Sequence, residues 1–324
     1  MKTICLNMIV KNESSIIERC LLSIKPLIDY WVIADTGSSD GTQEKILSYL
    51  KDVPGELLER PWVDFSHNRN EVLQASQGKG DYLLFIDADE WLLPSPPLDI
   101  FALQKDCYLI TARGKTSEFL KIFLINNHLN WTWHGVLHES LSSTQPTSKE
   151  TLPAILIYDE NSGSRAQNPQ KYLEDAKILE KALLKDPHHP RYTFYLAQCY
   201  THAQQFPQAL FYYEQRISLG GDSEELFWSL YCIACLKKDL NYPSHEIIKA
   251  FSKAYQYKPT QAEPLYRLAT HLEDRPFLAY LLTKYAKNIP LPQNAARLQN
   301  WIYEDLPQKF TEYESRLELR PKPH

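Results

Sequence analysis

Short apolar runs alternate with helical patterns over the first half of the chain. Residues 4–10, 30–34 and 82–86 are almost entirely apolar, and stretches with a helical period lie between them. Continuous apolar strands spaced by helices are typical of a parallel sheet that is covered on both faces. The pattern therefore predicts an α/β domain with a mixed, mostly parallel sheet. Further strands are expected over residues 57–59, 105–112, 119–125, 136–141 and 155–158, and helices over residues 15–24, 42–50 and 68–75.

The second half of the chain has helical patterns only. A register of about 34 residues that begins at Pro190 places Ala197 and Ala209 where tetratricopeptide repeats carry small residues. It places Tyr200 and Tyr213 where these repeats carry aromatic residues. We therefore expect paired helical repeats, with a plain helical bundle as the alternative. The helices are expected over residues 171–184, 192–203, 206–218, 224–236, 245–257, 262–272 and 277–287.

Composition and charge are those of a water-soluble protein with two domains. The chain has 324 residues, of which 44% are hydrophobic and 23% charged, and its net charge is −5. This acidic balance argues against a general nucleic-acid binder. No apolar run approaches the ~20 residues of a membrane-spanning helix, so we expect no transmembrane segment and a cytoplasmic location. The two domains are expected at residues 1–165 and 166–324.

The strongest chemical signal follows the apolar run at residues 82–86. The sequence there continues Asp87-Ala88-Asp89-Glu90, which contains a DxD motif. Because side chains alternate along an extended backbone, Asp87 and Asp89 are expected to face the same way, at the edge of the sheet where ligands bind. Two carboxylates in this position suit a hard divalent cation that also binds phosphate oxygens. A solvated acidic loop is the alternative for the motif taken alone.

Two more stretches end at the same predicted edge. The run at residues 30–34 leads into Asp35, and two glycines shortly after it permit a tight turn before the next helix. Asp35 is expected to face a ligand, whereas Asp40 is expected to cap that helix. The first strand ends just before Glu13, which is expected either to bind a base or ribose or to complement a helix dipole.

Aromatic and titratable residues form a second cluster at residues 131–141. Such a density of tryptophan, histidine and carboxylate is unlike a plain core strand. Structural packing remains the alternative for each residue taken singly. The members of this cluster are Trp131, Trp133, His134, His138 and Glu139.

Together these motifs resemble the family 2 glycosyltransferases of the GT-A fold. The resemblance rests on residues 4–13, 32–42 and 85–90, which follow in the family's order on the expected strands, and it covers residues 2–139. The stretch at residues 65–71 and the helical repeats narrow it to a bacterial branch that includes lipopolysaccharide-core and peptide glycosyltransferases. The resemblance implies a Rossmann-like GT-A domain followed by an all-α repeat domain.

By this resemblance, one group of residues binds the nucleotide sugar and a metal ion. Asp35 contacts the nucleotide base with help from Glu13. Arg69 lies beside the phosphates, although a helix-surface arginine is the alternative. Asp87 meets the ribose, the metal ion or its water, and Asp89 ligates Mg²⁺ or Mn²⁺ between the two phosphates. The metal ion would neutralise the departing nucleoside diphosphate.

A second group would carry the base and the sugar contacts. The family has its catalytic base on an acidic Glu-Asp motif, and His138-Glu139 occupies that place here. The resemblance implies that Glu139 deprotonates the acceptor. His138 would orient Glu139 or ligate the metal ion. His134 would contact the sugar, and Trp133 or Trp131 would stack on a sugar ring.

The expected function is that of a metal-dependent, inverting glycosyltransferase with a nucleotide-sugar donor, most simply a UDP-sugar. The acceptor is left open between a glycan, a lipid-linked glycan and a peptide, and a lipid-linked acceptor would bring the protein to the inner membrane face. The helical repeats are expected to form an acceptor-side surface or a homodimer contact. Two alternatives remain: a nucleotidyltransferase, for which a Gly-rich phosphate loop near the first strand is missing, and a non-catalytic protein whose repeats bind partners.

Overall fold

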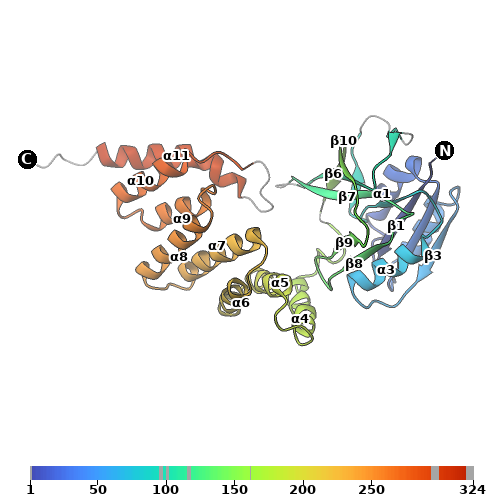
Figure 1. The fold of residues 1–324 in the computed structure, drawn as a ribbon, viewed down its shortest axis with the longest axis horizontal. Coiled ribbons are helices and arrows are strands. Elements are labelled where there is room, and N and C mark those ends of the chain that lie inside the picture. Colours follow the sequence, from blue (N-terminus) through green and yellow to red (C-terminus); the bar gives the residue numbers. More distant parts are fainter. Residues whose placement is uncertain are drawn as a thin grey trace, which may run out of the picture. The chain divides into compact units, whose positions relative to one another are not determined.

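The computed structural model divides into two compact units, residues 1–171 and 172–324 (Figure 1). The first contains all the strands described below, and the second is built from helices. The boundary expected at residue 165 lies shortly before this division. The structure describes residues 2–94, 98–99, 102–114, 118–160, 162–292 and 299–318.

The first unit is built on a mixed sheet with the strand order β3-β2-β1-β4-β7-β6-β10-β5. Its first four strands in this order are mutually parallel, so their carboxyl ends meet at one edge. Polar residues that follow these strands are thereby brought close together. The four strands are β1 (Ile4–Val10), β2 (Tyr30–Asp35), β3 (Gly55–Glu59) and β4 (Tyr82–Phe85).

The other half of the sheet contains both strand directions. β7 (Glu118–Asn126) runs antiparallel to β4 and to β6 (Cys107–Arg113). β10 (Lys149–Asp159) runs parallel to β6, and the short β5 (Glu90–Leu92) closes the sheet antiparallel to β10. The prediction of a mixed, mostly parallel sheet is therefore confirmed, although β10 is longer than the strand expected there.

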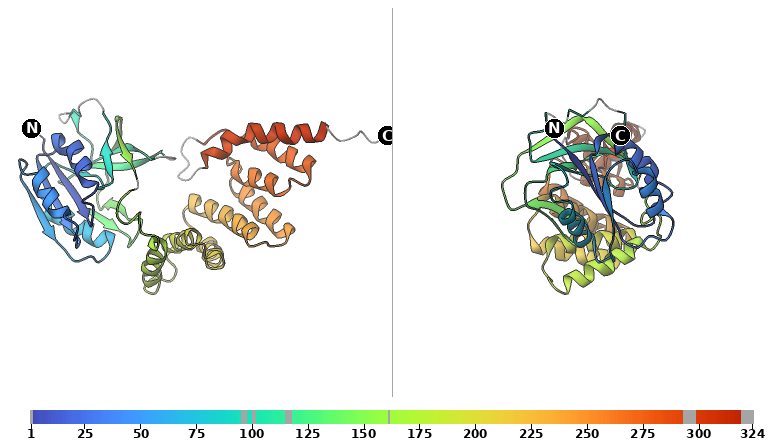
Figure 2. Two further views of the ribbon diagram at one scale, coloured as in Figure 1. Left: turned by 180° about the vertical axis from the view of Figure 1, so that it is seen from behind. Right: turned by 90° about the vertical axis from the view of Figure 1, so that its right-hand side faces the viewer.

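Helices cover both faces of the parallel half, which Figure 2 shows from two further directions. Leu6 of β1 belongs to the core cluster that contains Leu21 of α1, whereas Cys5 belongs to the cluster that contains Leu73 of α3. β1 is thus buried on both faces, which explains why its sequence is apolar without alternation. The helices of this unit are α1 (Ile17–Ile24), η1 (Lys25–Leu27), α2 (Thr42–Tyr49) and α3 (Phe65–Ala75).

The strand expected over residues 136–141 is wrong. Residues 135–139 form the turn of a separate two-stranded sheet, which consists of β8 (Trp131–His134) and β9 (Ser140–Ser143), so only residues 140 and 141 of the expected strand are extended. Gly135 has a φ of 103° and His138 a φ of 51°, and both values lie in the left-handed region that extended strands do not use. His138 and Glu139 therefore lie in or beside a turn.

The second unit consists of helices that pack in pairs. α5 packs on α6, α7 on α8 and α9 on α10, as the repeat pattern predicts. Ala197 and Ala209 are fully buried between helices, which confirms their place as small residues of the repeat. The helices are α4 (Lys171–Leu183), α5 (Pro190–His202), α6 (Phe206–Leu219), α7 (Ser223–Asp239), α8 (Ser244–Tyr257), α9 (Glu263–His271), α10 (Pro276–Ala286) and α11 (Asn300–Glu318).

One helix of this unit was not expected from the pattern. α11 contains Pro307 in its interior, and proline in a helical pattern ordinarily predicts a helix end. Its Ile302, Leu306 and Tyr313 are buried against α9 and α10, so tertiary packing outweighs the proline. Within the described part of the chain, no helix combines the length and the apolar character that crossing a membrane requires.

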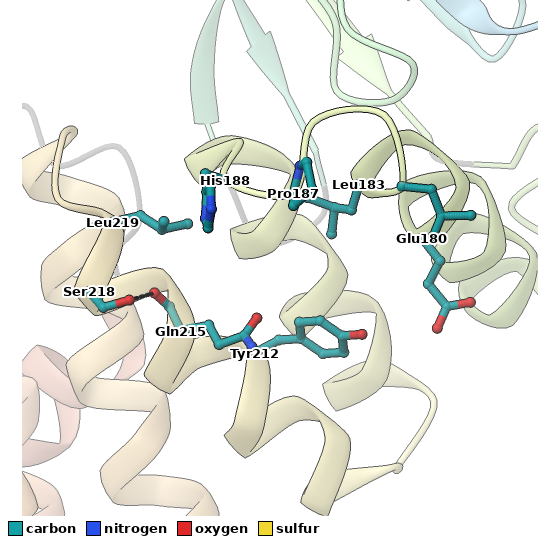
Figure 3. Close-up of a pocket in the computed structure, with 9 residues that line it drawn as sticks. Glu180, Leu183, Pro187, His188, Tyr212, Gln215, Ser218 and Leu219 are labelled. Carbon is teal, nitrogen blue, oxygen red and sulfur yellow. Dashed lines mark hydrogen bonds between the residues drawn. The ribbon is translucent and has the colours of Figure 1, made fainter.

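A cavity of about 610 Å³ opens between α4 and α6 (Figure 3). Its wall includes Tyr212, whose ring stacks on the ring of Tyr200 with centroids 5.6 Å apart. The Tyr200 hydroxyl donates a hydrogen bond to Glu180, which also lines the cavity. These tyrosines serve the packing of the repeats, and none of the site residues expected from the sequence lies in this unit.

Candidate functional site

The residues expected to carry chemistry meet at the carboxyl edge of the parallel strands. Asp35 ends β2, and the acidic motif with Asp87 and Asp89 follows β4. Glu13 follows β1, and Arg69 lies on α3. The structure brings Arg69, Asp87 and Glu139 into direct contact, and it places Glu13 and Asp89 against one backbone segment.

Asp35 is buried, and only one of its two carboxylate oxygens accepts hydrogen bonds. Its Oδ1 accepts hydrogen bonds from the backbone N–H groups of Gly37 and Ser38, at 2.8 and 2.7 Å. Gly37 has a φ of 103°, which explains why a glycine occupies this tight turn. The Asp35 Oδ2 is buried without a hydrogen-bond partner. A buried acceptor without a partner is costly, so this oxygen is suited to a donor on a ligand.

Asp40 joins the two loops of this edge and also contacts the start of α2, where the Thr42 N–H donates to its Oδ1 at 3.1 Å, so the expected cap is confirmed in part. The N-cap position of α2 belongs to Gly41, with a φ of 90°. Asp40 accepts hydrogen bonds from the Thr42 hydroxyl at 2.6 Å and from the Ser14 backbone at 3.0 Å. Burial alone would raise the pKa of Asp40, but these hydrogen bonds lower it to about 2. Asp40 thus fixes the β1–α1 loop against the β2–α2 loop.

Asp87 and Asp89 do not share one partner. The backbone between them is a turn, in which the Glu90 N–H donates to the Asp87 carbonyl at 3.0 Å. We expected both side chains to face the same way because side chains alternate along a strand. That expectation is wrong, because the backbone here is a turn and not a strand. Asp87 contacts Arg69 and Lys121, whereas Asp89 contacts the segment that follows β10.

Five charged side chains of alternating sign form what we call the charge chain: Glu90, Lys121, Asp87, Arg69 and Glu139. Lys121 Nζ lies 2.5 Å from Glu90 Oε2 and 2.7 Å from Asp87 Oδ2. Arg69 Nη2 lies 2.9 Å from Asp87 Oδ1, and Arg69 Nε lies 2.7 Å from Glu139 Oε1. The charge chain thus connects the acidic motif to the expected catalytic base.

Burial and pairing together set the charges of this chain. Burial alone would raise the pKa of Asp87, but Lys121 and Arg69 hold it well below its usual range. Burial alone would lower the pKa of Arg69, but Asp87 and Glu139 raise it. The Arg69 side chain is only 13% exposed, so the alternative of a helix-surface arginine is wrong.

Asp89 and Glu13 lie against the segment 162–167, which we call the acidic-edge segment. The Gly163 N–H donates to Asp89 Oδ2 at 3.1 Å, and the Ser164 N–H donates to Glu13 at 3.2 Å. Burial raises the pKa of Glu13 to about 7, and burial together with the nearby charges of Asp87 and Asp159 raises that of Asp89. No side chain caps α1 by a hydrogen bond, and the interaction of Glu13 with the helix dipole stays an alternative.

The tryptophans of the second cluster differ from each other. Trp131 is buried, and its indole N–H donates to the Asn126 carbonyl, so the expected stacking of Trp131 on a sugar is wrong. Trp133 is half-buried and lies below the Arg69 guanidinium, 5.1 Å from the ring centroid. The Asn70 amide makes two hydrogen bonds with the Trp133 backbone, which ties β8 to α3.

His134 and His138 are both exposed, at the end of β8 and in the turn before β9. Among the residues that the structure describes, no three His, Cys, Asp or Glu side chains gather in a way that could hold a metal ion. The roles of His134 in sugar binding and of His138 beside Glu139 or at a metal ion stay predictions.

Several residues of the site were not expected from the sequence. Lys121 of β7 and Glu90 are part of the charge chain. Gly163 contacts Asp89, and Ser164 contacts Glu13. A lysine inside an otherwise apolar strand is the one signal that could have indicated Lys121. Gly163 and Ser164 carry no such signal, because their contacts come from distant parts of the chain.

Known proteins match both halves of the chain in part. Residues 5–137 match the family model of glycosyl transferase family 2. The chain is 37% identical over 94 residues to a TPR repeat-containing protein of Synechococcus elongatus, which is 29% of this chain and 22% of that protein. It is 26% identical over 218 residues to the SPbeta prophage-derived glycosyltransferase SunS of Bacillus subtilis, which is 60% of this chain and 49% of SunS. The chain thus spans at most about half the length of these relatives.

Similarity to solved structures is weaker. The structure of S. aureus TarS aligns with 80% of this chain and 53% of its own chain, at 14% identity and a TM-score of 0.42. That of MamA aligns with 46% of this chain and 90% of its own, at 12% identity and a TM-score of 0.34. Scores of this size add nothing to the fold described above. From the match over residues 5–137, the chain carries a domain of glycosyl transferase family 2, and tetratricopeptide-like helical repeats follow it.

Proposed function

We propose that the protein is an inverting glycosyltransferase that moves a sugar from a nucleoside diphosphate donor to an acceptor nucleophile. The observation that carries this proposal is the joining of the acidic motif to Glu139 through Arg69, at the same sheet edge as the half-satisfied Asp35. The family match over residues 5–137 supports it. One base candidate and no evident nucleophile favour a single displacement with inversion at the anomeric carbon.

The donor would bind along the carboxyl ends of β1, β2 and β4. The open Asp35 Oδ2 is suited to accept a hydrogen bond from an N–H of the base, which favours uracil and therefore a UDP-sugar. Glu13 lies close enough to the acidic motif to contact the ribose or base. Arg69 supplies a positive charge and its Nη1 donors for a diphosphate oxygen, because Nε and Nη2 are taken by Glu139 and Asp87. His134 and Trp133 are the proposed sugar contacts.

The residues at the acidic motif fit a divalent cation. Asp89 offers a carboxylate whose pKa is raised by burial and by neighbouring negative charge, an environment that a cation relieves. Carboxylate oxygens are the ligands that Mg²⁺ and Mn²⁺ prefer, and phosphate oxygens of the donor would complete the set. We propose Asp89 as the main ligand, with Asp87 and His138 as further candidates. When bound, the cation supplies charge neutralisation for the departing diphosphate.

Glu139 is the proposed base. Arg69 occupies its Oε1, and no hydrogen bond to Oε2 comes from the described residues, so this oxygen is available to take a proton. In the proposed step the acceptor O–H or S–H gives its proton to Glu139 as the acceptor atom bonds to the anomeric carbon. The bond between that carbon and the diphosphate oxygen breaks, and its electron pair leaves with the nucleoside diphosphate. His138 would orient Glu139.

The acceptor is proposed only as a class: a glycan, a lipid-linked glycan or a peptide. The helical repeats of the second unit stack in pairs, and such arrays form extended concave surfaces that suit a long acceptor or a second copy of the chain.

A thermal-shift panel tests the proposal. The full-length protein is heated with UDP, GDP, CDP and dTDP sugars, each with and without Mn²⁺ or Mg²⁺. A UDP-sugar together with a metal ion is expected to raise the melting temperature, because a ligand that binds only the folded state stabilises it. Asp35→Ala should abolish the shift, whereas Asp52→Ala, at an exposed position on the same unit, should keep it. No shift with any nucleotide sugar would overturn the proposal.

A further inference from the structure

Asp87 divides its two carboxylate oxygens between two cations. Its Oδ1 pairs with Arg69 Nη2 at 2.9 Å, and its Oδ2 pairs with Lys121 Nζ at 2.7 Å. Arg69 in turn divides its guanidinium between Asp87 and Glu139. Arg69 therefore forms one hydrogen bond with each of its two carboxylate partners. Carboxylate and guanidinium ordinarily pair through two parallel hydrogen bonds.

Lys121 is itself held firmly in place. It lies on β7, and its side chain is 19% exposed. Both oxygens of Glu90 accept from its ammonium, and Glu90 also accepts from the Asp87 N–H at 2.7 Å. Since the Glu90 side chain is only 3% exposed, the ammonium has a fixed, nearly buried anchor.

The removal of Lys121 has a predictable geometric consequence. Asp87 Oδ2 would lose its partner while it remains close to the Arg69 guanidinium. The favoured response is a two-pronged pair between Asp87 and Arg69, with Nη2 and either Nε or Nη1 as donors. A pair through Nε takes the hydrogen bond away from Glu139, and a pair through Nη1 turns the guanidinium, so that the angle of the Nε contact with Glu139 changes. Either change disturbs the contact that fixes the orientation of Glu139.

We propose that Lys121 is a positioning residue for sugar transfer, which fixes the proposed base Glu139 through Asp87 and Arg69. The inference rests on the proposed function, because it assigns Lys121 a role in that reaction. The partners of Lys121 among the described residues are Asp87 and Glu90, so any effect of Lys121 on Glu139 is indirect. A purely structural role would instead join β7 to the turn between β4 and β5 and would affect stability alone.

The experiment compares Lys121→Met and Lys121→Arg with Lys79→Met as the matched control. Lys79 forms a pair of similar length with Glu56, but it precedes β4 and so lies at the opposite end of the strands. The readouts are kcat and KM for release of UDP from the UDP-sugar that the thermal panel identifies, the Kd of UDP with Mn²⁺ by calorimetry, and the melting temperature.

Lys121→Met is expected to lower kcat by about 10- to 100-fold, as a misplaced group ordinarily does, while KM and the Kd of UDP change by less than about threefold. Lys121→Arg should restore most of kcat because it keeps a cation on Asp87 Oδ2. Lys79→Met should leave kcat unchanged. A folded Lys121→Met protein with the kcat of the wild type overturns the inference, as does a Lys121→Arg protein that regains stability without regaining kcat.

A second variant covers the case in which Lys121→Met does not fold. Glu90→Gln keeps Lys121 but weakens its anchor, and it is expected to lower kcat in the same direction by a smaller factor. A folded Glu90→Gln protein with unchanged kcat then overturns the inference. A wild-type protein that neither binds nor cleaves any nucleotide sugar defeats the proposed function instead, so the two failures are distinct.

Discussion

Each unit buries an arginine, and the two arginines have different surroundings. Arg216 in the second unit is fully buried, and its Nε and Nη2 both pair with Glu225 Oε2, at 3.2 and 3.1 Å. Its Nη1 donates to the Gly220 carbonyl, and Arg191 meets the other oxygen of Glu225. Every charged group of this cluster is matched within the protein.

Arg69 in the first unit lies between two carboxylates, and the network around it is not closed. Glu139 keeps one oxygen without a described partner. Asp35 Oδ2 and the Trp133 indole nitrogen are buried nearby at the same edge without hydrogen bonds. A buried ion pair whose hydrogen-bonding groups are all matched within the protein serves the structure. A buried ion pair with unmatched donors and acceptors around it indicates a ligand-binding or catalytic site.

The largest effect is expected from Asp89→Ala, which removes a carboxylate beside the open network, at the same edge of the sheet. Sugar transfer with Mn²⁺ should fall by about 10³-fold or more, because stabilisation of the leaving diphosphate is lost. Steady-state kinetics measures the loss, and circular dichroism checks that the fold is kept. Retained turnover in a folded variant would remove Asp89 from the metal site.

The next effect is expected from Glu139→Gln, which keeps the shape of the side chain but removes its ability to take a proton. Turnover should fall by about 10²-fold, whereas the Kd for UDP with Mn²⁺ should stay near that of the wild type. Kinetics and calorimetry on the same preparation separate the two quantities. Near-normal turnover would place the base elsewhere.

Arg216→Met opens the closed network of the second unit. Because Glu225 would be left buried with only the longer, 3.4 Å contact to Arg191, the free energy of unfolding of this unit should fall by about 3 kcal/mol. Urea denaturation followed by tryptophan fluorescence measures the change. UDP binding by the first unit should be unaffected, and a loss of binding would contradict the separation of the two roles.

The smallest effect concerns pH and Glu13. Burial raises the pKa of Glu13 from 4.5 to about 7 in the folded protein. The folded state therefore holds more protons than the unfolded chain between these values, and stability should fall as pH rises through this window. Glu13→Gln should flatten that decline by about 1 kcal/mol, a figure reduced for partial exposure of the side chain. Denaturation without metal or nucleotide at pH 5 and pH 7 tests this, and identical slopes would contradict it.

The parts of the fold that follow local rules could be predicted from the sequence. The apolar runs that became β1, β2 and β4 are buried on both faces, so their composition alone distinguishes them. The acidic motif and Asp35 were found because they follow such runs directly. The small residues Ala197 and Ala209 were found because the repeat places them at a fixed period.

The parts that depend on contacts between distant residues could not be predicted. Lys121 meets Asp87 across a separation of 34 residues, and Ser164 meets Glu13 across 151. No local pattern encodes such pairs. The sequence pattern predicts a strand at His138 because apolar and polar positions carry no signal of its left-handed backbone.

The acidic-edge segment has a practical consequence for dissecting the molecule. A Cβ atom at Gly163 would lie 3.2 Å from Asp89 Oδ2 and 3.3 Å from Glu13 Oε1, so the absence of a side chain lets this peptide approach both carboxylates closely. The chain crosses both acids on its way out of β10, before α4 begins. A shortened protein that stops at the end of β10 would keep every strand of the sheet and still expose both acids to water. Any attempt to isolate the first unit should therefore extend at least through Gln167.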